Sequence, residues 1–343
     1  MIAETIKNSA RILSGAAIAE EIKAEVSREV KKLEKEYGFR PCLVVVRVGE
    51  DKASAVYVGS KVKTSEELGI ISEHRHLPAE TSQEELLEIV DDLNCREDVD
   101  GILVQLPLPK QIDESAILEK INPEKDVDGF HPVNVGKLSQ GQKALAPCTP
   151  AGIIEILKRS DIEIAGKHAV IVGRSNIVGK PMAMLLLQEN ATVTICHSRT
   201  INLAEITSQA DILVAAIGRA GFIRGEHIKT DATVIDVGMN NVSEVEFAKE
   251  LFDESEIEKR LNTIEKRGFT LVGDVNPKDA KAKAANFTPV PGGVGLLTVA
   301  MLMRNTVEAA RMRRIKGEKG KREKDKLTDR KTFSLFPFSP LQI

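Results

Sequence analysis

Short apolar runs recur along this chain, and glycine or proline bounds several of them. "CLVVVRVG" (42–49) follows Pro41, and "DGILVQLPLP" (100–109) contains the prolines that end it. A continuous apolar run of this length predicts a strand that is buried on both faces, as in a parallel sheet. Helical patterns at 16–37 and 82–94 precede the two runs. This alternation predicts an N-terminal α/β domain.

The alternation of strand and helix restarts after "PCTPAG" (147–152), which is expected to open a helix. We therefore expect a second, Rossmann-like α/β domain with a doubly wound parallel sheet. A long helix at 293–312 has one apolar face and is expected to pack on the first domain. The predicted strands of the second domain are 168–173, 192–196, 211–218 and 233–238, and its predicted helices are 179–190 and 203–210.

Two segments differ from this pattern. Residues 243–267 are highly charged and predict a helical insertion on the surface of the second domain. Residues 316–343 begin with too many charges to bury a core, which predicts a disordered tail. The final "FSLFPFSPLQI" leaves open the alternative that this tail docks on a partner.

Composition excludes several classes of protein. A net charge of -3 gives no electrostatic signal for nucleic acid, and no apolar stretch is long enough to span a membrane. The N-terminus lacks the apolar segment of a secretory signal, so we expect a cytoplasmic protein, although a transit peptide stays open. The four cysteines form no C-x-x-C and, with no cluster at ligand spacing, no metal site is implied.

"VIVGRSNIVGKP" (170–181) follows a predicted strand and opens a predicted helix. Gly173 permits a tight turn, Ser175 replaces the second glycine of the usual dinucleotide fingerprint, and Gly179 lets the helix approach the strand. Backbone N–H groups at such a helix start can hold phosphate. The alternative is a plain strand–turn–helix, but the surrounding βαβ pattern favours nucleotide binding.

The next predicted strand refines the cofactor. A fold that binds NAD often carries an acid about 20 residues after the glycine turn. Here the strand ends "ICHSRT" (195–200), which has no acid. Ser198, Arg199 and Arg174 suit a 2′-phosphate, so the sequence favours NADP, unless both arginines are merely solvated loop residues.

Polar side chains follow the strands of the first domain. Tyr57 and Lys61 share one face of the helix after the first strand, and Gln105 stands at the end of another. Asp126 and Asp128 lie in "EKDVDGFHP" (124–132). Because ligands bind outside the carboxyl ends of parallel strands, these side chains are expected to converge. Alternatives are a solvated helix face, a glutamine that caps backbone, and aspartates that only form a turn.

Several longer stretches carry a specific resemblance. They span roughly residues 10–315: "YVGSKVK" (57–63), "GILVQLPLP" (101–109), "PEKDVDGFHPVNVGKL" (123–138), "PCTPAGI" (147–153), "GRSNIVGKP" (173–181) and "TPVPGGVG" (288–295). In these stretches and in their order, the chain resembles the bifunctional methylenetetrahydrofolate dehydrogenase/methenyltetrahydrofolate cyclohydrolase family, most of all its bacterial single-polypeptide type.

The resemblance implies a fold and an activity. A folate-binding catalytic domain (1–148 plus 290–315) and an NADP-binding Rossmann domain (149–289) would enclose a cleft. The enzyme would oxidise 5,10-methylenetetrahydrofolate to the methenyl form with NADP, and then hydrolyse that cation to 10-formyltetrahydrofolate. This is one-carbon metabolism that serves purine biosynthesis, and the family leads us to expect a homodimer.

The resemblance also implies residue roles. Lys61 would be the central catalytic group, Gln105 would hydrogen-bond it, Tyr57 would stack and orient the substrate, and Asp128 would hold the pterin edge. Substrate-binding positions would be Ser54, Leu106, Pro291, Gly292, Gly293 and Val294. Cofactor-binding positions would be Thr149, Gly173, Arg174, Ser175, Ser198, Arg199, Gly218 and Met239.

Three departures from the family pattern stand near these positions. "GLLT" (295–298) replaces a usual Pro-Met before the Thr, Met239 replaces an isoleucine, and 240–270 is longer than expected. Two other functions are alternatives: a dehydrogenase of another small substrate, as in the shikimate dehydrogenases, and a nucleotide-sensing protein without catalysis. The first would not need "VQLPLP" or "PVPGGVG", and intact Tyr57, Lys61, Gln105 and Asp128 argue against the second.

Overall fold

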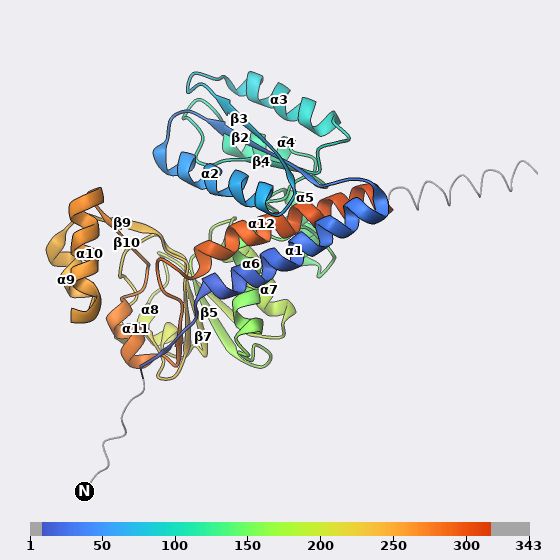
Figure 1. Cartoon of the computed structure of the whole chain (residues 1–343). Helices are drawn as coiled ribbons and strands as arrows, with labels where there is room; N and C mark the ends of the chain where they lie inside the picture. The colour runs from blue at the N-terminus through green and yellow to red at the C-terminus, as the bar shows by residue number, and fades with distance from the viewer. Residues whose placement is uncertain (1–8, 317–343) are drawn as a thin grey trace, which may run out of the picture.

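The computed structural model describes residues 9–316, apart from the side chains of Lys52, Ala53 and Lys316. In this range the chain forms a parallel sheet of three strands, a parallel sheet of six strands and a short antiparallel pair. Figure 1 shows the two parallel sheets on opposite sides of two long helices, α1 and α12. None of the helices in residues 9–316 is both long and apolar enough to cross a membrane. From residue 317 on, the predicted disordered tail lies outside the described residues.

The three-stranded sheet has the order β3-β2-β4, and β2 is parallel to both neighbours. Every residue of β2 is buried, which accounts for its continuous apolar sequence. Ser82 and Glu85 close a capping box that starts α3. The elements are β2 (Cys42–Val48), α2 (Lys52–Glu67), β3 (Ile71–Leu77), α3 (Gln83–Cys95), β4 (Gly101–Val104), α4 (Glu114–Lys120) and α5 (Pro132–Ser139).

The six-stranded sheet has the order β1-β11-β8-β7-β5-β6, and all its neighbouring strands are parallel. The strand order reverses at β5, which lies between β6 and β7. This is the doubly wound arrangement that the sequence predicted. Its elements are α6 (Cys148–Arg159), β5 (His168–Val172), α7 (Gly179–Gln188), β6 (Thr192–Cys196), α8 (Leu203–Thr207), β7 (Ile212–Ala215), η1 (Gly225–His227), β8 (Thr233–Asp236), α11 (Pro277–Lys283) and β11 (Asn286–Phe287).

The edge strand β1 (Arg11–Ile12) was not predicted. Arg11 pairs with Asn286 and Ile12 with Phe287, so this N-terminal segment joins the sheet of the second domain. Two residues are too few to produce a periodic apolar pattern. Arg11 and Ile12 therefore belong to the sheet of the second domain, although the chain then enters α1 and forms the first domain.

Two long helices connect the domains. α1 (Gly15–Tyr37) packs along α12 (Val294–Ala310), which continues into η2 (Arg311–Lys316). As predicted, α12 packs on the first domain, against α2, β2 and β4, and it also contacts α6. Arg304 on α12 forms ion pairs with Glu25 on α1 (3.0 Å) and Glu155 on α6 (2.6 Å). One continuous core runs from Val45 in the small sheet to Ile171 in the large sheet.

The charged stretch after β8 forms a small lobe of its own. β9 (Asn240–Val242) and β10 (Thr270–Val272) pair antiparallel and enclose α9 (Val245–Leu251) and α10 (Glu254–Arg267). Leu251, Phe252, Val242 and Val272 make a separate small core beneath these helices. The predicted helical insertion is thus confirmed, and Figure 1 shows it projecting at the side of the large sheet.

Two local details define the ends of these elements. Ser54 is a residue type that can cap a helix, but it is not the N-cap of α2, because the helix starts at Lys52 and Asp51 caps it by accepting a 2.7 Å hydrogen bond from the Ser54 amide. An aspartate carboxylate is as good a cap as serine, and it stands nearer the strand. The predicted strand at 100–109 ends at Val104, so Gln105 lies just beyond the sheet.

Candidate active site

Lys61 and Gln105 meet because of the order of the small sheet. β2 is the central strand, and the chain leaves its carboxyl end into α2, which carries Lys61. β4 pairs beside β2 and ends at Val104, so Gln105 lies at the same edge. Such a reversal of strand order leaves a crevice at the carboxyl ends of the strands. The meeting of Lys61 and Gln105 therefore follows from the strand order of the small sheet and from the positions of these two residues after β2 and β4.

The Lys61 side chain is buried, and its Nζ donates a 2.9 Å hydrogen bond to Oε1 of Gln105. Nε2 of Gln105 donates in turn to the Leu106 carbonyl at 2.7 Å. These two bonds fix which end of the amide faces the lysine, since a flipped amide would place two donors together. Ser65, one turn further along α2, donates to the Lys61 carbonyl and to Sδ of Met303 on α12.

The two aspartates of the 124–132 loop have different surroundings. Asp126 is buried and accepts hydrogen bonds from the amides of Gly129, Phe130 and His131. It shapes the loop, as the turn alternative proposed. Asp128 is partly exposed and accepts no hydrogen bond from any of the described residues 9–316. Its carboxylate is therefore open to a ligand.

Charge couples Asp128 to the lysine. Burial raises the pKa of Asp128 to about 6, while the positive charge of Lys61 acts to lower it and the carboxylate of Asp126 acts to raise it. Asn305 on α12 donates to the carbonyls of Val127 (2.8 Å) and Ala146 (2.9 Å), which holds the loop in place. The Asp128 carboxylate and the buried Lys61 amine thus lie close enough to interact electrostatically.

Tyr57 lies one turn before Lys61 on α2, and its hydroxyl donates a 2.8 Å hydrogen bond to Sδ of Met239. Burial raises the pKa of this phenol. Met239 follows β8 in the second domain and its side chain is 47% exposed. The Tyr57–Met239 contact therefore spans the crevice between the two domains.

A cavity of about 250 Å³ opens beside Tyr57. Pro291, Gly292, Gly293 and Val294 line it, together with Met239, and Ser60, Thr64 and Lys23 also contribute. The predicted substrate positions of the 289–295 loop thus lie next to Tyr57. Ser54 is buried in the first turn of α2, and Leu106 supplies the carbonyl that orients Gln105; neither lines this cavity.

Glycine is required in the 289–293 loop for steric reasons. Gly292 has a φ of 108°, and a Cβ on Gly293 would lie 2.6 Å from the Pro289 carbonyl oxygen. The Gly292 carbonyl accepts a 2.8 Å hydrogen bond from the amide of Gly15, the first residue of α1. The start of α1 therefore holds in place the loop that lines the cavity.

The turn after β5 fits a dinucleotide phosphate. Gly173 has a φ of 134°, and a Cβ there would lie 2.2 Å from the Ala216 carbonyl oxygen at the end of β7. A Cβ on Gly179 would lie 2.2 Å from the Gly173 carbonyl oxygen. Ser175 accepts from the amides of Val178 and Gly179, the first residues of α7. This close approach between strand and helix leaves room for phosphate above the helix start.

Four of the other predicted cofactor positions follow the carboxyl ends of β5, β6 and β7, whereas Met239 lines the cavity beside Tyr57. Arg174, Ser198 and Arg199 are exposed at the carboxyl ends of β5 and β6, where a ribose phosphate would lie. Gly218, with a φ of 68°, follows β7. Thr149 hydrogen-bonds Thr298 (3.0 Å) and so joins α6 to α12.

Two buried carboxylates that the sequence analysis missed organise the cofactor side. Asp274 accepts hydrogen bonds from the amides of residues 217–219, at 2.6, 3.0 and 2.8 Å, and from Asn240. Asp236 accepts from the amides of Gly238, Asp274 and Val275, and burial raises its pKa to about 8. The sequence signal for Asp274 was "GDV" (273–275), in which the aspartate stands between a glycine and a valine.

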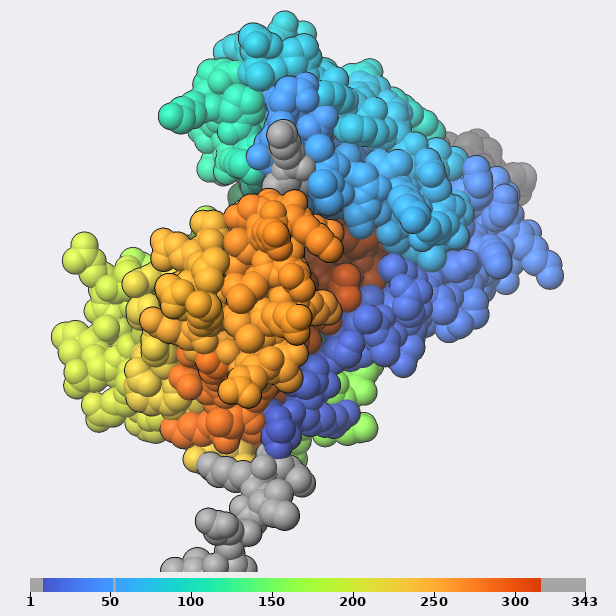
Figure 2. Space-filling view, turned by 60° about the vertical axis from the view of Figure 1, so that its left-hand side comes forward, coloured from blue at the N-terminus to red at the C-terminus, as the bar shows by residue number. Residues whose placement is uncertain are grey.

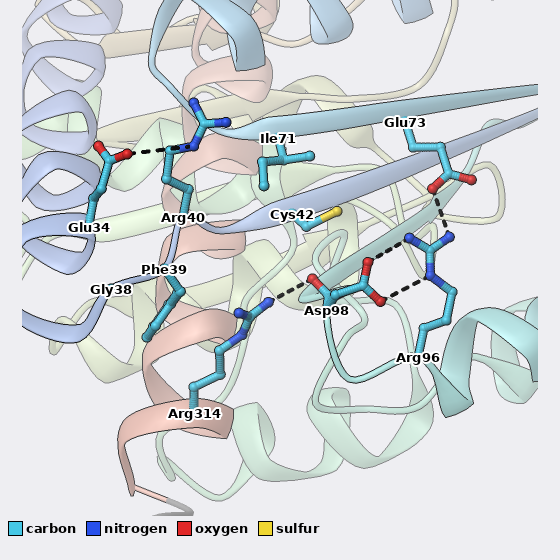
Figure 3. A pocket seen from close by; sticks show the side chains of 10 residues that line it. All are labelled: Glu34, Gly38, Phe39, Arg40, Cys42, Ile71, Glu73, Arg96, Asp98 and Arg314. Carbon is cyan, nitrogen blue, oxygen red and sulfur yellow. Dashed lines mark hydrogen bonds and ion pairs between the residues drawn. The ribbon is translucent and has the colours of Figure 1, made fainter.

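A second, strongly charged cavity lies at the amino ends of β2 and β3 (Figure 3). Arg96 pairs there with Glu73 and Asp98, both at 2.7 Å. Arg314 on η2 donates to the Asp98 carbonyl and pairs with the buried Asp100. These charged groups pair with one another. The contacts of Arg314 fix η2, which continues α12, to the first domain.

Comparisons with known proteins agree with this arrangement. The model of the "tetrahydrofolate dehydrogenase/cyclohydrolase, catalytic domain" matches residues 13–128, and that of the "tetrahydrofolate dehydrogenase/cyclohydrolase, NAD(P)-binding domain" matches 147–314. The bifunctional protein FolD of Koribacter versatilis is 55% identical over 306 residues, which cover 89% of this chain and 98% of that protein.

Solved structures give the same result. The bifunctional FolD of Campylobacter jejuni is 42% identical, with a TM-score of 0.80 and coverage of 89% of this chain and 100% of that one. FolD of Trypanosoma brucei, solved with NADP and an inhibitor, is 42% identical, with a TM-score of 0.79 and coverage of 89% and 99%. The matches confirm the predicted α/β fold, the predicted bifunctional enzyme and the nicotinamide dinucleotide cofactor. The chain belongs to the tetrahydrofolate dehydrogenase/cyclohydrolase family.

Proposed function

We propose that this enzyme oxidises 5,10-methylenetetrahydrofolate with NADP and hydrolyses the resulting methenyl cation to 10-formyltetrahydrofolate, with both steps in the crevice beside Lys61. The observation that carries this proposal is the Lys61–Gln105 hydrogen bond at the end of β2 and β4, with Asp128 facing the same space. A buried amine oriented by an amide is suited to moving a proton.

The first step needs positioning above all. NADP supplies the acceptor for the hydride that leaves the methylene carbon. Tyr57 stacks on the folate and, through its contact with Met239, lies at the border between the two domains. Asp128 accepts hydrogen bonds from the N–H groups of the pterin edge. Pro291, Gly292 and Gly293 line the other side of the substrate and exclude water.

The second step needs proton transfer. Water adds to the methenyl carbon and loses a proton, and a proton then reaches N5 as the bond from carbon to N5 breaks. The cationic substrate disfavours a second positive charge beside it, which favours the neutral amine of Lys61. Gln105 directs that amine. Lys61 therefore takes a proton from water and returns one to nitrogen.

The cofactor site supports NADP in particular. Arg174 and Arg199 are exposed where the 2′-phosphate of the adenosine ribose would lie, and they have no carboxylate partner among residues 9–316. Ser175 and the α7 helix start hold the pyrophosphate. A division into a folate domain (1–148 plus 290–315) and a Rossmann domain (149–289), and a cytoplasmic homodimer, complete the proposal. β1 is an exception to this division, since it pairs in the large sheet.

One assay tests the proposal. The purified chain is mixed with 5,10-methylenetetrahydrofolate and NADP, and the absorbances of NADPH and of the methenyl intermediate are followed separately. The proposal expects NADPH to form and the methenyl signal to rise and then decay. NADPH without decay of added methenyltetrahydrofolate would remove the cyclohydrolase step. An absence of both signals would contradict the proposed function.

A further inference from the structure

The insertion forms one wall of a groove that continues from the substrate cavity. This groove has a volume of about 1180 Å³. Val56, Tyr57, Met239, Pro289 and Pro291 line both the groove and the cavity beside Tyr57. The opposite wall is α10, and Figure 2 shows the orange insertion facing the blue segment that contains α2. A ligand that extends outward past Tyr57 therefore meets α10.

Arg260 fixes this wall to the substrate loop. It donates to the carbonyls of Leu271 and Val290, both at 3.1 Å, and its guanidinium lies 4.2 Å from the centre of the Phe252 ring. Val290 immediately precedes Pro291, which lines the substrate cavity. Arg260 is therefore committed to backbone and ring contacts, and it places α10 at a constant position relative to the loop.

The cations that remain on the groove side of α10 are Lys259, Lys266 and Arg267. All three are exposed, and none has a carboxylate partner among the described residues 9–316. Their spacing of seven and eight residues puts them on one helix face, over about 12 Å of helix length.

Two acidic side chains also line the groove, and both already have partners. Glu256 pairs with Lys281 at 3.0 Å, and Asp51 accepts the Ser54 amide at the start of α2. The wall opposite Tyr57 therefore carries positive charge that nothing on this face neutralises.

We propose that Lys259, Lys266 and Arg267 bind the carboxylates of the glutamyl tail of the folate substrate, so that the enzyme prefers substrates with several γ-linked glutamates. This inference rests on the proposed function, which places the pterin edge at Asp128 and stacks Tyr57 on the folate. The glutamyl end then leaves the cavity between Tyr57 and Pro291, toward α10. Each added glutamate supplies one more carboxylate to a row of exposed cations.

The test compares the Michaelis constants of 5,10-methylenetetrahydrofolate as its monoglutamate and as its pentaglutamate, with the full chain and saturating NADP. The wild type is expected to show a value about tenfold lower for the pentaglutamate, since three exposed ion pairs each contribute modestly. In the variant Lys259→Gln/Lys266→Gln/Arg267→Gln this ratio should fall close to one. Salt at 0.5 M should reduce the wild-type ratio in the same direction.

Matched controls separate the outcomes. Lys249→Gln removes an exposed lysine of the same lobe, on α9 and paired with Glu246, and should keep the wild-type ratio, whereas Lys266→Gln should lower it. An unchanged Tm shows that the triple variant folds. Equal Michaelis constants for both substrates in the wild type, or a ratio that survives the triple substitution, would overturn the inference while the proposed function stands.

Two further outcomes are distinguishable. A raised Michaelis constant for NADP in the triple variant, at an unchanged ratio, would assign these cations to the cofactor instead and would also overturn the inference. If the wild type does not oxidise the monoglutamate, the proposed function fails. Calorimetry with p-aminobenzoyl-pentaglutamate, which lacks the pterin, still tests the inference in that case. The wild type is expected to bind this compound. No binding to the wild type would refute the proposed subsite.

Discussion

Both polar atoms of the Gln105 amide are hydrogen-bonded. Oε1 accepts from Nζ of Lys61 at 2.9 Å, and Nε2 donates to the Leu106 carbonyl at 2.7 Å. Gln105→Leu keeps most of the side-chain volume and removes both bonds. It leaves Lys61 buried without its acceptor, so the lysine is no longer directed at the substrate. We expect cyclohydrolase kcat to fall at least tenfold, with a smaller change in the Michaelis constant for folate. Unchanged hydrolysis of methenyltetrahydrofolate would show that the amide does not direct the lysine.

Asp128 predicts how substrate binding depends on pH. Its pKa of about 6 means that the carboxylate is largely ionised at pH 7.5 and largely protonated at pH 5. Only the ionised form accepts hydrogen bonds from pterin N–H groups with both oxygens. The Michaelis constant for folate should therefore rise as pH falls through 6. Asp128→Asn should raise it at pH 7.5 by about ten- to a hundredfold and flatten this pH dependence.

The same residue predicts a stability effect of known sign. An unfolded aspartate titrates near 3.9, so between about pH 4 and 6 the folded chain holds a proton that the unfolded chain has lost. The contribution of Asp128 to the free energy of unfolding thus falls as pH rises through this window. Asp128→Asn removes this contribution. Denaturant titrations of both proteins at pH 4.5 and 7.5 should show a smaller loss for the variant, and an equal loss would contradict the raised pKa.

Much of the fold was predictable because its strands are buried on both faces. The runs at 42–49 and 168–173 are recognisable as strands from the sequence, since they are short, rich in β-branched residues and followed by glycine. Two details were not predictable, for local reasons. Asp51 and Ser54 are both good capping residues near the start of α2, and the sequence alone does not choose between them. β1 has two residues and depends on pairing with β11, some 275 positions away in the sequence.

Arg174 predicts cofactor preference. Arg174→Ala should raise the Michaelis constant for NADP about ten- to a hundredfold, because one charge-assisted hydrogen bond to phosphate contributes about 1.5–3 kcal/mol. The value for NAD should change little, since NAD lacks that phosphate. Initial rates with each cofactor decide this. If the wild type uses NAD as well as NADP, or if the substitution affects both equally, Arg174 does not bind the 2′-phosphate.

Asp274 predicts a coupled loss of stability and cofactor binding. Its carboxylate is buried and accepts the amides of Ile217, Gly218 and Arg219. Asp274→Ala leaves these N–H groups without an acceptor, at about 1–3 kcal/mol for each that stays buried. We expect a lower Tm and a raised Michaelis constant for NADP. Asp279→Ala is a useful comparison, because among residues 9–316 the Asp279 carboxylate accepts only from the amide of Gly225 and from none of residues 217–219.

The candidate site was predictable only in part. Tyr57, Lys61, Gln105 and Asp128 could be expected to converge because they follow the carboxyl ends of parallel strands. The structure brings Lys61 to Gln105 and Asp128, with Tyr57 one turn before Lys61 on α2. Their chemical roles came from the family resemblance, since spacing does not separate a catalytic lysine from a solvated one. Arg260 could not be identified at all. Its partners are carbonyl oxygens of Leu271 and Val290, and a contact to backbone leaves no trace in side-chain patterns.

The central claim is that Lys61 transfers the proton in hydrolysis and is less important for hydride transfer. The most direct measurement is the rate of both steps in Lys61→Ala, beside Lys63→Ala. The second variant removes an exposed lysine of the same helix, which pairs with Glu67 alone among the described residues. We predict that Lys61→Ala lowers cyclohydrolase kcat by about 10²–10⁴-fold and dehydrogenase kcat much less, while Lys63→Ala leaves both near the wild-type values. An equal loss of both activities in Lys61→Ala, at unchanged folate binding, would contradict this division of roles.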